Sequence, residues 1–419
     1  MRKPKGTSST RPQRASFEYT FLVTLTLILL AVGIVMVFSA SWASAYFAEG
    51  EGDSYLYLKR ELLFASLGLI LMFGLARFDF TRLRKAAPLL MLLSLSLLFL
   101  VFIPGVGVTA KGATRWIGYG PAAFQPSELA KLAVVLYVAT VMFKRPRLLG
   151  DLKSLFLPVL GLPVLACLLV LFQPDMGTAI IIVLAMAGML VIGGARKKDI
   201  AVMGGVAAVL GFAYVALAPY RMARLTTFID PWSDPRESGF QIIQSMVALG
   251  SGGIFGVGIG ESIQKFNYLP EAHTDMIVAI IGEELGLLGV LGVVFLYAAF
   301  AYVGYRIALN CDNPFGKYLA AGLTSLMVGQ AAVNLGAVTG LLPLTGIPLP
   351  IISYGGSNLI VMLSGIGILL NIAVNPRGKI ATVPQRKLRA VKGGDGGRRY
   401  RGASRPGAGN RRSAQGQRR

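Results

Sequence analysis

The 419-residue chain has little of what soluble enzymes commonly use for chemistry, since it contains one histidine and two cysteines. No cluster of His and Cys ligands with metal-binding spacing occurs, so a zinc site of that kind is excluded. No Walker motif occurs either, and we therefore expect no nucleotide site. Charged residues make up only 15% of the chain, against 54% hydrophobic residues. An enzyme of this composition must take a substrate that arrives already activated.

The hydrophobic residues are concentrated in long runs, which indicates an all-α polytopic membrane protein. The first run, Phe17 to Ala40, is too long for the core of a signal peptide and should stay as a transmembrane helix. Runs long enough to span a bilayer predict about ten transmembrane helices. Their expected ranges are 17–41, 57–76, 87–104, 128–143, 154–172, 177–193, 199–218, 276–305, 317–340 and 355–375.

Lysine and arginine cluster in three connections between these helices, near residues 77–85, 144–153 and 196–198. By the positive-inside rule these loops lie in the cytoplasm, which places both termini there as well. Alternation then makes residues 219–275, between helices seven and eight, one large external loop. Within this loop, the stretch Gly239 to Gly250 predicts an amphipathic helix at the membrane interface.

Composition divides the chain into a basic N-terminal tail (1–16), a ten-helix transmembrane domain (17–376) and a basic C-terminal tail (377–419). The second tail holds fourteen Lys and Arg residues and one acid, Asp395, and so supplies +13 of the net charge of +21. Its richness in Gly, Ser and Arg predicts disorder. Because a basic segment beside a membrane more often binds anionic lipid or a cytoplasmic partner, we expect contact with membrane lipids and no nucleic-acid binding.

Asp275 stands directly before an apolar run from Met276 to Tyr305. Ionisable groups at a bilayer surface are costly unless they face protein or a water-filled cavity, so this aspartate is a candidate catalytic residue. It could also cap the helix, since Asp is favoured at a helix N-terminus, and the two roles are compatible.

Four further polar motifs fall on the external side of the expected topology. They are GATRW at 112–116, QPSELAK at 125–131, QPDMG at 173–177 and LTGIPLPIISYGGS at 344–357. Each has an ordinary explanation as an interfacial anchor, an i,i+3 ion pair, a helix start or a rigid loop. Together with Asp275, however, they supply carboxylates, cations and exposed backbone N–H donors, which suit a phosphate-bearing amphiphile.

Two acids, Glu283 and Glu284, lie inside the run that follows Asp275. At about 100° per residue, Glu283 falls about 80° from Asp275 around the helix axis and Glu284 about 180°. We therefore expect Glu283 to approach the site and Glu284 to face a neighbouring helix.

These motifs, together with PEAHTD at 270–275 and GEELG at 282–286, resemble in consistent order those of the bacterial SEDS family of peptidoglycan glycosyltransferases. The resemblance covers residues 17–376, and segments 227–232 and 267–270 look closer to its division members (FtsW-type) than to its elongation members (RodA-type). It implies polymerisation of lipid II into glycan strands at the outer face of the cytoplasmic membrane, with undecaprenyl pyrophosphate as the leaving group. It also implies a class B penicillin-binding protein transpeptidase and other divisome proteins as partners at the division septum.

The resemblance assigns roles to single residues. The aspartate of the HTD motif is catalytic in such enzymes, so Asp275 is predicted to be the general base of an inverting glycosyl transfer. Arg115 and Lys131 match basic positions of the family and are predicted to contact the pyrophosphate. The other residues predicted to bind substrate are Glu128, Ser353, Gly355, His273 and Arg60. His273 could equally be an ordinary loop residue.

A divalent cation, Mg²⁺ or Mn²⁺, is implied by the family, but no ligand set can be read from the sequence.

Two other functions compete with the glycosyltransferase. Proline- and glycine-broken segments with intramembrane acids would also suit a transporter or flippase of the lipid-linked precursor. A nonenzymatic divisome scaffold is the third alternative. The crowding of polar motifs on one side disfavours transport, and the many ionisable groups at membrane level disfavour a scaffold.

Overall fold

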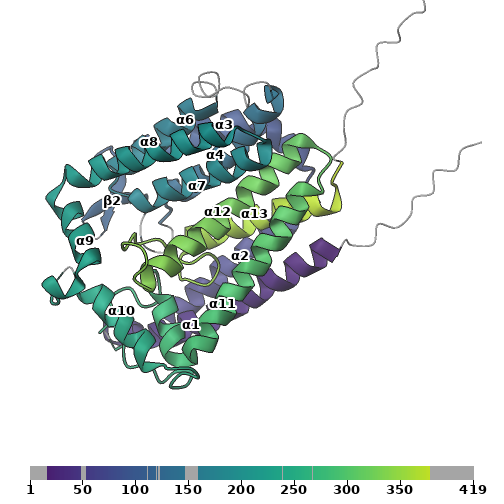
Figure 1. Cartoon of the computed structure of the whole chain (residues 1–419). Helices are drawn as coiled ribbons and strands as arrows, with labels where there is room; N and C mark the ends of the chain where they lie inside the picture. Colours follow the sequence, from purple (N-terminus) through teal and green to yellow (C-terminus); the bar gives the residue numbers. More distant parts are fainter. Residues whose placement is uncertain are drawn as a thin grey trace, which may run out of the picture. The chain divides into compact units, whose positions relative to one another are not determined.

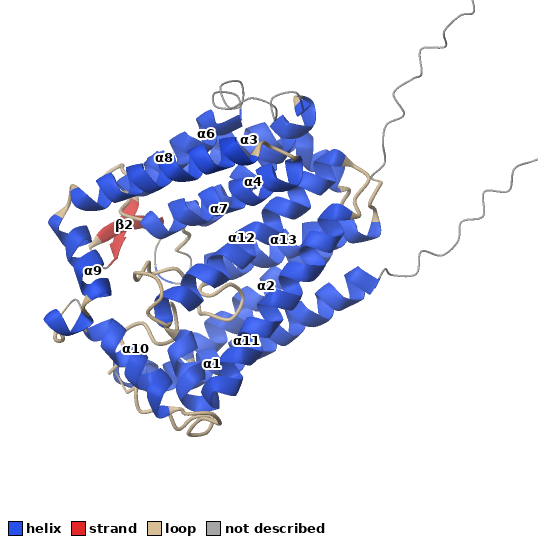
Figure 2. Cartoon of the chain, viewed as in Figure 1, coloured by secondary structure: helices blue, strands red, loops and turns tan. Residues whose placement is uncertain are grey.

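A computed structural model of the chain describes residues 17–48, 53–110, 112–118, 120, 123–146, 159–237, 239–266 and 268–377. The predicted basic tails lie outside these residues, except for Arg377. Helices dominate the described part of the chain, and a single two-stranded hairpin is the only sheet within it (Figures 1 and 2). The predicted all-α class is confirmed.

Each of the ten predicted spans corresponds to one observed helix. These helices are α1 (Phe17–Ala48), α2 (Leu56–Arg77), α3 (Phe80–Leu100), α4 (Pro126–Lys144), α6 (Gly161–Phe172), α7 (Met176–Gly193), α8 (Lys197–Ala216), α11 (Ile277–Leu309), α12 (Pro314–Val338) and α13 (Gly356–Val374). Within the described ranges, eight helices are long and apolar enough to cross a membrane. The other two are α2, whose first turns carry charged residues, and α6, which has only 12 residues. The chain is therefore a multi-pass membrane protein.

Helix α3 begins earlier than the predicted start at residue 87. It starts at Phe80, because the carboxylate of Asp79 accepts a hydrogen bond from the Thr81 amide at 3.0 Å and caps the helix. The prediction was wrong because the basic residues that follow were assigned to the loop. They extend instead from the first turns of the helix.

Helices α4, α12 and α13 form the most deeply buried part of the bundle, whereas none of the residues of α8 is buried. Helix α2 packs along α13 through small residues. A Cβ atom added at Gly367 would lie 2.4 Å from the carbonyl oxygen of Met72, so this close approach requires glycine. Asn371 fastens the same pair of helices, since its amide donates to the Ala76 carbonyl at 2.7 Å.

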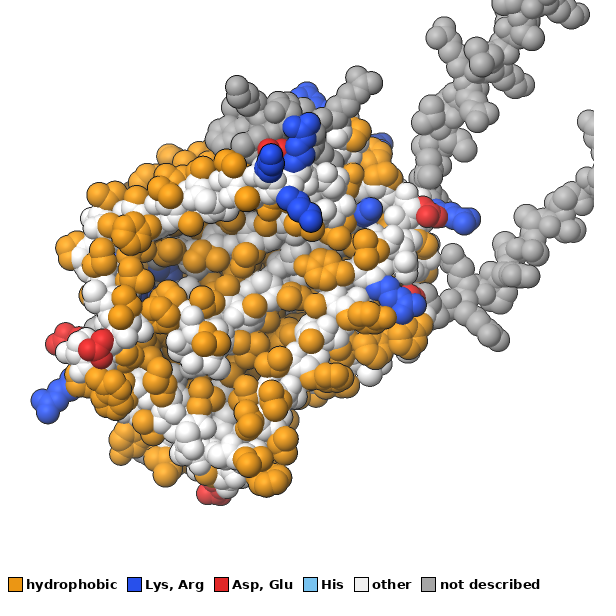
Figure 3. Space-filling view, in the orientation of Figure 1, with side chains coloured by type: hydrophobic (Ala, Val, Ile, Leu, Met, Phe, Trp, Pro, Cys, Tyr) orange, Lys and Arg blue, Asp and Glu red, His pale blue; other side chains and the backbone are white. Residues whose placement is uncertain are grey.

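The N-terminal ends of α2, α4, α7, α11 and α13 meet at one end of the bundle, which we call the site end. The Gln125 amide before α4 donates to Ser357 Oγ in the first turn of α13 at 3.2 Å, which joins two of these ends. The GATRW motif also lies at this end, in the strand β2 (Ala113–Ile117), which pairs antiparallel with β1 (Gly107–Ala110). The sequence did not predict this hairpin. Basic side chains gather at the opposite end of the bundle, where α1 begins and α13 ends (Figure 3).

The long loop before α11 contains helix α9 (Pro219–Ile229), the 3-10 turn η4 (Pro231–Ser233) and helix α10 (Phe240–Ser251). The predicted helix at 239–250 is thus confirmed. It packs against α11 with Ile242, Ile243 and Ala248 buried. Its buried apolar side therefore contacts protein, and its place at the membrane interface stays a prediction.

Helix α11 is broken at Gly286, whose backbone angles are φ 67° and ψ −164°. The loop after α10 fits into this break, since the Val257 amide donates to the Glu283 carbonyl and the Leu287 amide to the Gly253 carbonyl, both at 2.9 Å. A Cβ atom at position 286 would lie 2.4 Å from the Gly256 nitrogen, so only glycine fits there. The half of α11 before the break is buried in protein, and the half after it exposes leucine and phenylalanine side chains.

Candidate active site

Asp275 lies in a tight turn immediately before α11. Glu271 turns the chain with φ 59°, and its carbonyl accepts hydrogen bonds from the amides of Thr274 at 3.1 Å and Met276 at 3.2 Å. The N-cap residue of α11 is Met276, and the helix has no side-chain cap. The alternative interpretation of Asp275 as the N-cap residue is therefore wrong, and the Thr274 hydroxyl donates to its carboxylate at 3.3 Å.

The backbone of Asp275 is fixed by a residue that the sequence interpretation missed. Asn334, on α12, donates from its side-chain amide to the Asp275 carbonyl at 2.7 Å and to the Ile347 carbonyl at 2.8 Å. The Asp275 carboxylate faces the loop that contains Gly346 and Ile347, because a Cβ atom added at Gly346 would lie 3.8 Å from the Asp275 Oδ2 atom. Asn334 therefore joins the HTD turn to the proline-rich loop before α13.

Glu128 and Lys131 form an ion pair of 2.9 Å inside the bundle, with 4% and 1% of their side chains exposed. Lys131 also donates to Gln330 Oε1 at 2.7 Å, and Glu128 accepts from the Asn358 amide at 2.9 Å. Gln330 in turn donates to the Pro348 carbonyl at 2.9 Å. The Lys131 ammonium is thus paired and enclosed in this structure, and the pyrophosphate contact predicted for it stays a prediction.

Gln330 and Asn334 stand one turn apart on α12 and hold the same proline-rich loop. The signal available in the sequence was a pair of amides at i and i+4 within an apolar helix. It went unnoticed because neutral amides carry no charge and belong to no motif that the sequence interpretation considered.

Arg115 lies on β2 and is half-buried. Its Nε atom donates to the Gln173 carbonyl at 2.9 Å, and its Nη2 atom donates to the Pro174 carbonyl. Asp175, the next residue, caps α7 by accepting hydrogen bonds from the amide and hydroxyl of Thr178 at 3.0 and 2.9 Å. The structure therefore brings the GATRW and QPDMG motifs together at the site end.

The loop before α13 contains the next two predicted site residues. Ser353 is buried, and its Oγ atom accepts a hydrogen bond from the Leu349 amide at 2.8 Å, so it shapes the loop. The Tyr354 amide donates to the His273 carbonyl at 2.9 Å. Gly355 is the N-cap residue of α13. This loop and the HTD turn are therefore neighbours through both backbone and side chains.

Three rings from three segments meet beside the HTD turn. The ring centroid of Tyr57, on α2, lies 4.6 Å from that of His273 and 5.1 Å from that of Tyr354. Arg60 hydrogen-bonds to the Tyr354 hydroxyl, whose pKa is raised by burial and lowered in part by this guanidinium. His273 and Arg60 thus lie around Tyr354 beside the HTD turn, and their part in substrate binding stays a prediction.

Glu284 faces a neighbouring helix, α1, as predicted, although the phase count from Asp275 does not hold. Its carboxylate accepts hydrogen bonds from the Ser39 hydroxyl at 2.6 and 2.8 Å and pairs with Lys265 at 3.3 Å, with both charged side chains fully buried. This acid therefore fastens α11 to α1 and to the loop before the HTD turn.

Glu283 is also buried, but its partners belong to the loop after α10. Its carboxylate accepts from the Ile263 amide at 3.0 Å and from the Ser262 hydroxyl. The expected approach of Glu283 to Asp275 was based on counting 100° steps from Asp275. That count does not apply, because the helix begins at Ile277 and Asp275 lies in the preceding turn.

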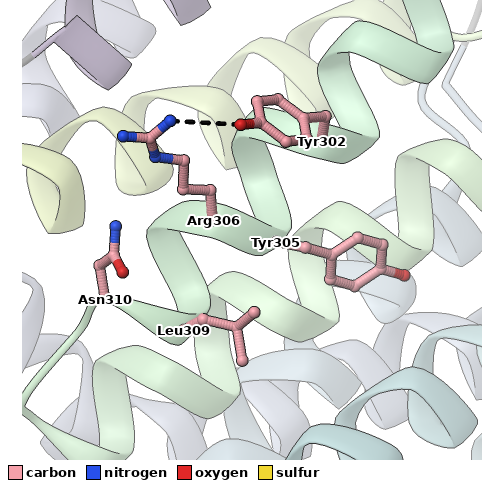
Figure 4. A pocket seen from close by; sticks show the side chains of 5 residues that line it. All are labelled: Tyr302, Tyr305, Arg306, Leu309 and Asn310. Carbon is pink, nitrogen blue, oxygen red and sulfur yellow. Dashed lines mark hydrogen bonds between the residues drawn. The ribbon is translucent and has the colours of Figure 1, made fainter.

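No metal site emerges from the described residues, among which no group of three or more His, Cys, Asp or Glu side chains converges. A surface cavity of about 460 Å³ lies far from Asp275, at the other end of α11 (Figure 4). There Arg306 donates to the Tyr302 hydroxyl at 3.3 Å and pairs with Glu18 at 3.1 Å. A second cavity, of about 470 Å³, lies at the site end between the β-hairpin and the ends of α3 and α6.

The fold and the site define a multi-pass helical membrane protein with acidic, basic and aromatic side chains gathered at one end of its bundle. Residues 19–378 match the family model described as a cell cycle protein, which unites FtsW, RodA and SpoVE. The chain therefore belongs to the SEDS family, as the motifs predicted.

Two curated relatives and one solved structure illustrate the similarity. The stage V sporulation protein E of Bacillus subtilis is 43% identical over 84% of this chain and 96% of its own length. The probable peptidoglycan glycosyltransferase FtsW of Geobacter sp. strain M18 is 43% identical over the same shares. A chain in a solved peptidoglycan synthase complex is 30% identical, with a TM-score of 0.66 over 85% of this chain and 97% of its own.

Proposed function

We propose that this protein is a peptidoglycan glycosyltransferase that polymerises lipid II during septal cell-wall synthesis. The names of its relatives support the activity. The observation that carries the proposal is the placement of Asp275 in a built turn, held by Asn334 and not used as the cap of α11. The test is polymerisation of lipid II by the purified protein together with its cognate transpeptidase, with glycan strands separated on a gel.

The proposed reaction is a single displacement at the anomeric carbon of the donor. Asp275 takes the proton of the 4-hydroxyl of the acceptor N-acetylglucosamine as the hydroxyl oxygen forms the new glycosidic bond with inversion. The bond from the anomeric carbon to the pyrophosphate oxygen breaks, and undecaprenyl pyrophosphate leaves with the electron pair. Holding the hydroxyl in line contributes much of the barrier reduction.

A divalent cation, Mg²⁺ or Mn²⁺, fits this proposal as a partner of the pyrophosphate. Such ions are commonly held by one or two carboxylates together with phosphate oxygens. When bound, the ion would neutralise negative charge on the leaving group.

We propose that the site end faces the outside of the cytoplasmic membrane and that both termini are cytoplasmic. The support is the positive-inside pattern, in which Arg77, Arg82 and Arg84 lie at the opposite end. An impermeant maleimide should label a Glu237→Cys variant in intact cells stripped of any outer membrane, because Glu237 is exposed between η4 and α10. Asp312→Cys, at the opposite end, should react only after permeabilisation. The reverse pattern would overturn the proposed orientation.

The proposed partners are a class B penicillin-binding protein, other divisome proteins and membrane lipids. The solved complex of a similar chain coordinates polymerization and crosslinking, which supports a transpeptidase partner. We assign the C-terminal tail to electrostatic contacts with lipid or partner, because it carries +13 charge.

Truncation after Lys379 should therefore leave lipid II polymerisation in detergent nearly unchanged, since no candidate site residue lies beyond it. The measurement is the initial rate of polymer formation, with the folding of each protein checked by size-exclusion chromatography. Loss of most activity in a well-folded truncation would assign the tail a direct part in the reaction.

A further inference from the structure

Arg221, in the first turn of α9, is held in place by a residue of α8. Its guanidinium carbon lies 3.7 Å from the centre of the Tyr214 ring, and its Nη1 atom donates to the Tyr214 carbonyl at 3.0 Å. Stacking of this kind holds a guanidinium in place while leaving other N–H groups available. The sequence interpretation did not select this arginine.

Tyr214 connects Arg221 to Arg115. The Tyr214 hydroxyl donates to the Leu171 carbonyl at 2.6 Å, and Arg115 donates to the Gln173 carbonyl two residues further along at 2.9 Å. The charged groups that act on the Tyr214 hydroxyl are Arg221, Arg115 and Asp175. Both guanidiniums are therefore gathered where α6 ends, and Figure 3 shows basic atoms set back in a hollow beside α8 and α9.

Both guanidiniums keep their positive charge unpaired. Throughout the described ranges, neither Arg115 nor Arg221 forms an ion pair with a carboxylate. Asp175, the acid that acts on the Tyr214 hydroxyl, is occupied as the cap of α7. Lys131, by contrast, is enclosed and paired with Glu128. Arg115 and Arg221 are therefore two cations available to an anion at this end of the bundle.

We propose that Arg221 and Arg115 together bind the pyrophosphate of the lipid-linked substrate. Two guanidinium forks match the several oxygens of a pyrophosphate and form charge-assisted hydrogen bonds with them. Their contacts with protein use two N–H groups of Arg115 and one of Arg221, which leaves donors on each side chain. The inference rests on the proposed function for the identity of the substrate, but its test measures binding directly.

The competing explanation is structural, because arginines also cap the carbonyl end of a helix, here α6 for Arg115 and α8 for Arg221. A cap would contribute to stability without selecting a ligand. An anionic phospholipid headgroup offers the same phosphate chemistry and is the second source of ligand. The experiment therefore compares undecaprenyl pyrophosphate with phosphatidylglycerol, using the full-length protein in detergent and measuring the dissociation constant and the melting temperature.

Arg221→Gln should weaken binding of undecaprenyl pyrophosphate by about 10-fold or more, the usual effect of losing a charge-assisted hydrogen bond. Arg221→Lys keeps the charge but not the fork, so it should fall between the wild type and Arg221→Gln. Arg236→Gln is the matched control, since Arg236 is an exposed arginine of the same loop, and it should bind as the wild type does.

Unchanged affinity in Arg221→Gln, or in Arg221→Lys where the glutamine variant does not fold, would overturn the proposal. An equal loss for phosphatidylglycerol would assign the pair to bulk lipid and overturn the substrate role. A lower melting temperature with unchanged affinity would leave only the helix cap. These outcomes are independent of whether the wild type polymerises lipid II, so failure of the proposed function is recognised separately.

Discussion

Asp275→Asn should reduce lipid II polymerisation by about 100-fold or more, since general acid–base catalysis contributes about that much to a rate. Asparagine keeps the size of the side chain but cannot take the hydroxyl proton. Because Asn334 holds Asp275 through its backbone carbonyl, the turn should persist in the variant. The measurement is the initial rate of polymer formation by the purified protein with its transpeptidase.

Asp312→Asn serves as the matched control for this substitution. Asp312 lies at the opposite end of the bundle, with 66% of its side chain exposed and an ion pair to Arg377. The Asp312→Asn protein should polymerise lipid II at the wild-type rate. A near-normal rate in Asp275→Asn would contradict the catalytic assignment. A transporter would instead move lipid II across vesicles and form no polymer with the wild type or either variant.

Lys131→Met should strongly destabilise the protein, because it leaves the Glu128 carboxylate unpaired inside the bundle. Removing one partner of a buried ion pair typically costs about 3–5 kcal/mol. The double variant Glu128→Gln with Lys131→Met removes both charges and should recover most of the lost stability. The measurement is the melting temperature of each purified protein in detergent.

The same variants decide between the two roles of Lys131. A structural pair predicts that the double variant regains both melting temperature and binding of undecaprenyl pyrophosphate. Direct contact with the pyrophosphate predicts that the double variant is stable but still binds this ligand weakly. The second result would restore the contact expected from the sequence.

The sequence predicted the spans well because bilayer crossing needs only length and hydrophobicity, which each segment carries by itself. Single polar residues were harder to place. The chemistry of Lys131 depends on Gln330, which stands 199 positions further along the chain. Asn334 and Arg221 belong to no motif and gain their meaning only from the carbonyls and ring that the fold brings to them.

The role of Asp275 likewise depended on the fold and not on the local sequence alone. The residue types around it indicated a functional site, but whether Asp275 caps the helix depended on where α11 begins. That boundary is set by Glu271, whose carbonyl collects two amides of the turn. A positive φ at a glutamate is unusual, and no periodic pattern in the sequence announces it.

The break in α11 has a consequence for the depth at which a lipid-linked sugar must react. The part of the helix from Leu287 to Leu309 is alone long enough to cross about 30 Å of hydrocarbon. Because the chain is non-helical at Gly286, the turns from Ile277 to Gly286 do not simply continue that crossing. Asn334, which holds the Asp275 carbonyl, comes 20 residues after the start of α12, a rise of about 30 Å. The HTD turn therefore lies about one bilayer thickness from the start of α12, and a polyprenyl tail can remain among the acyl chains while its head group reaches the carboxylate.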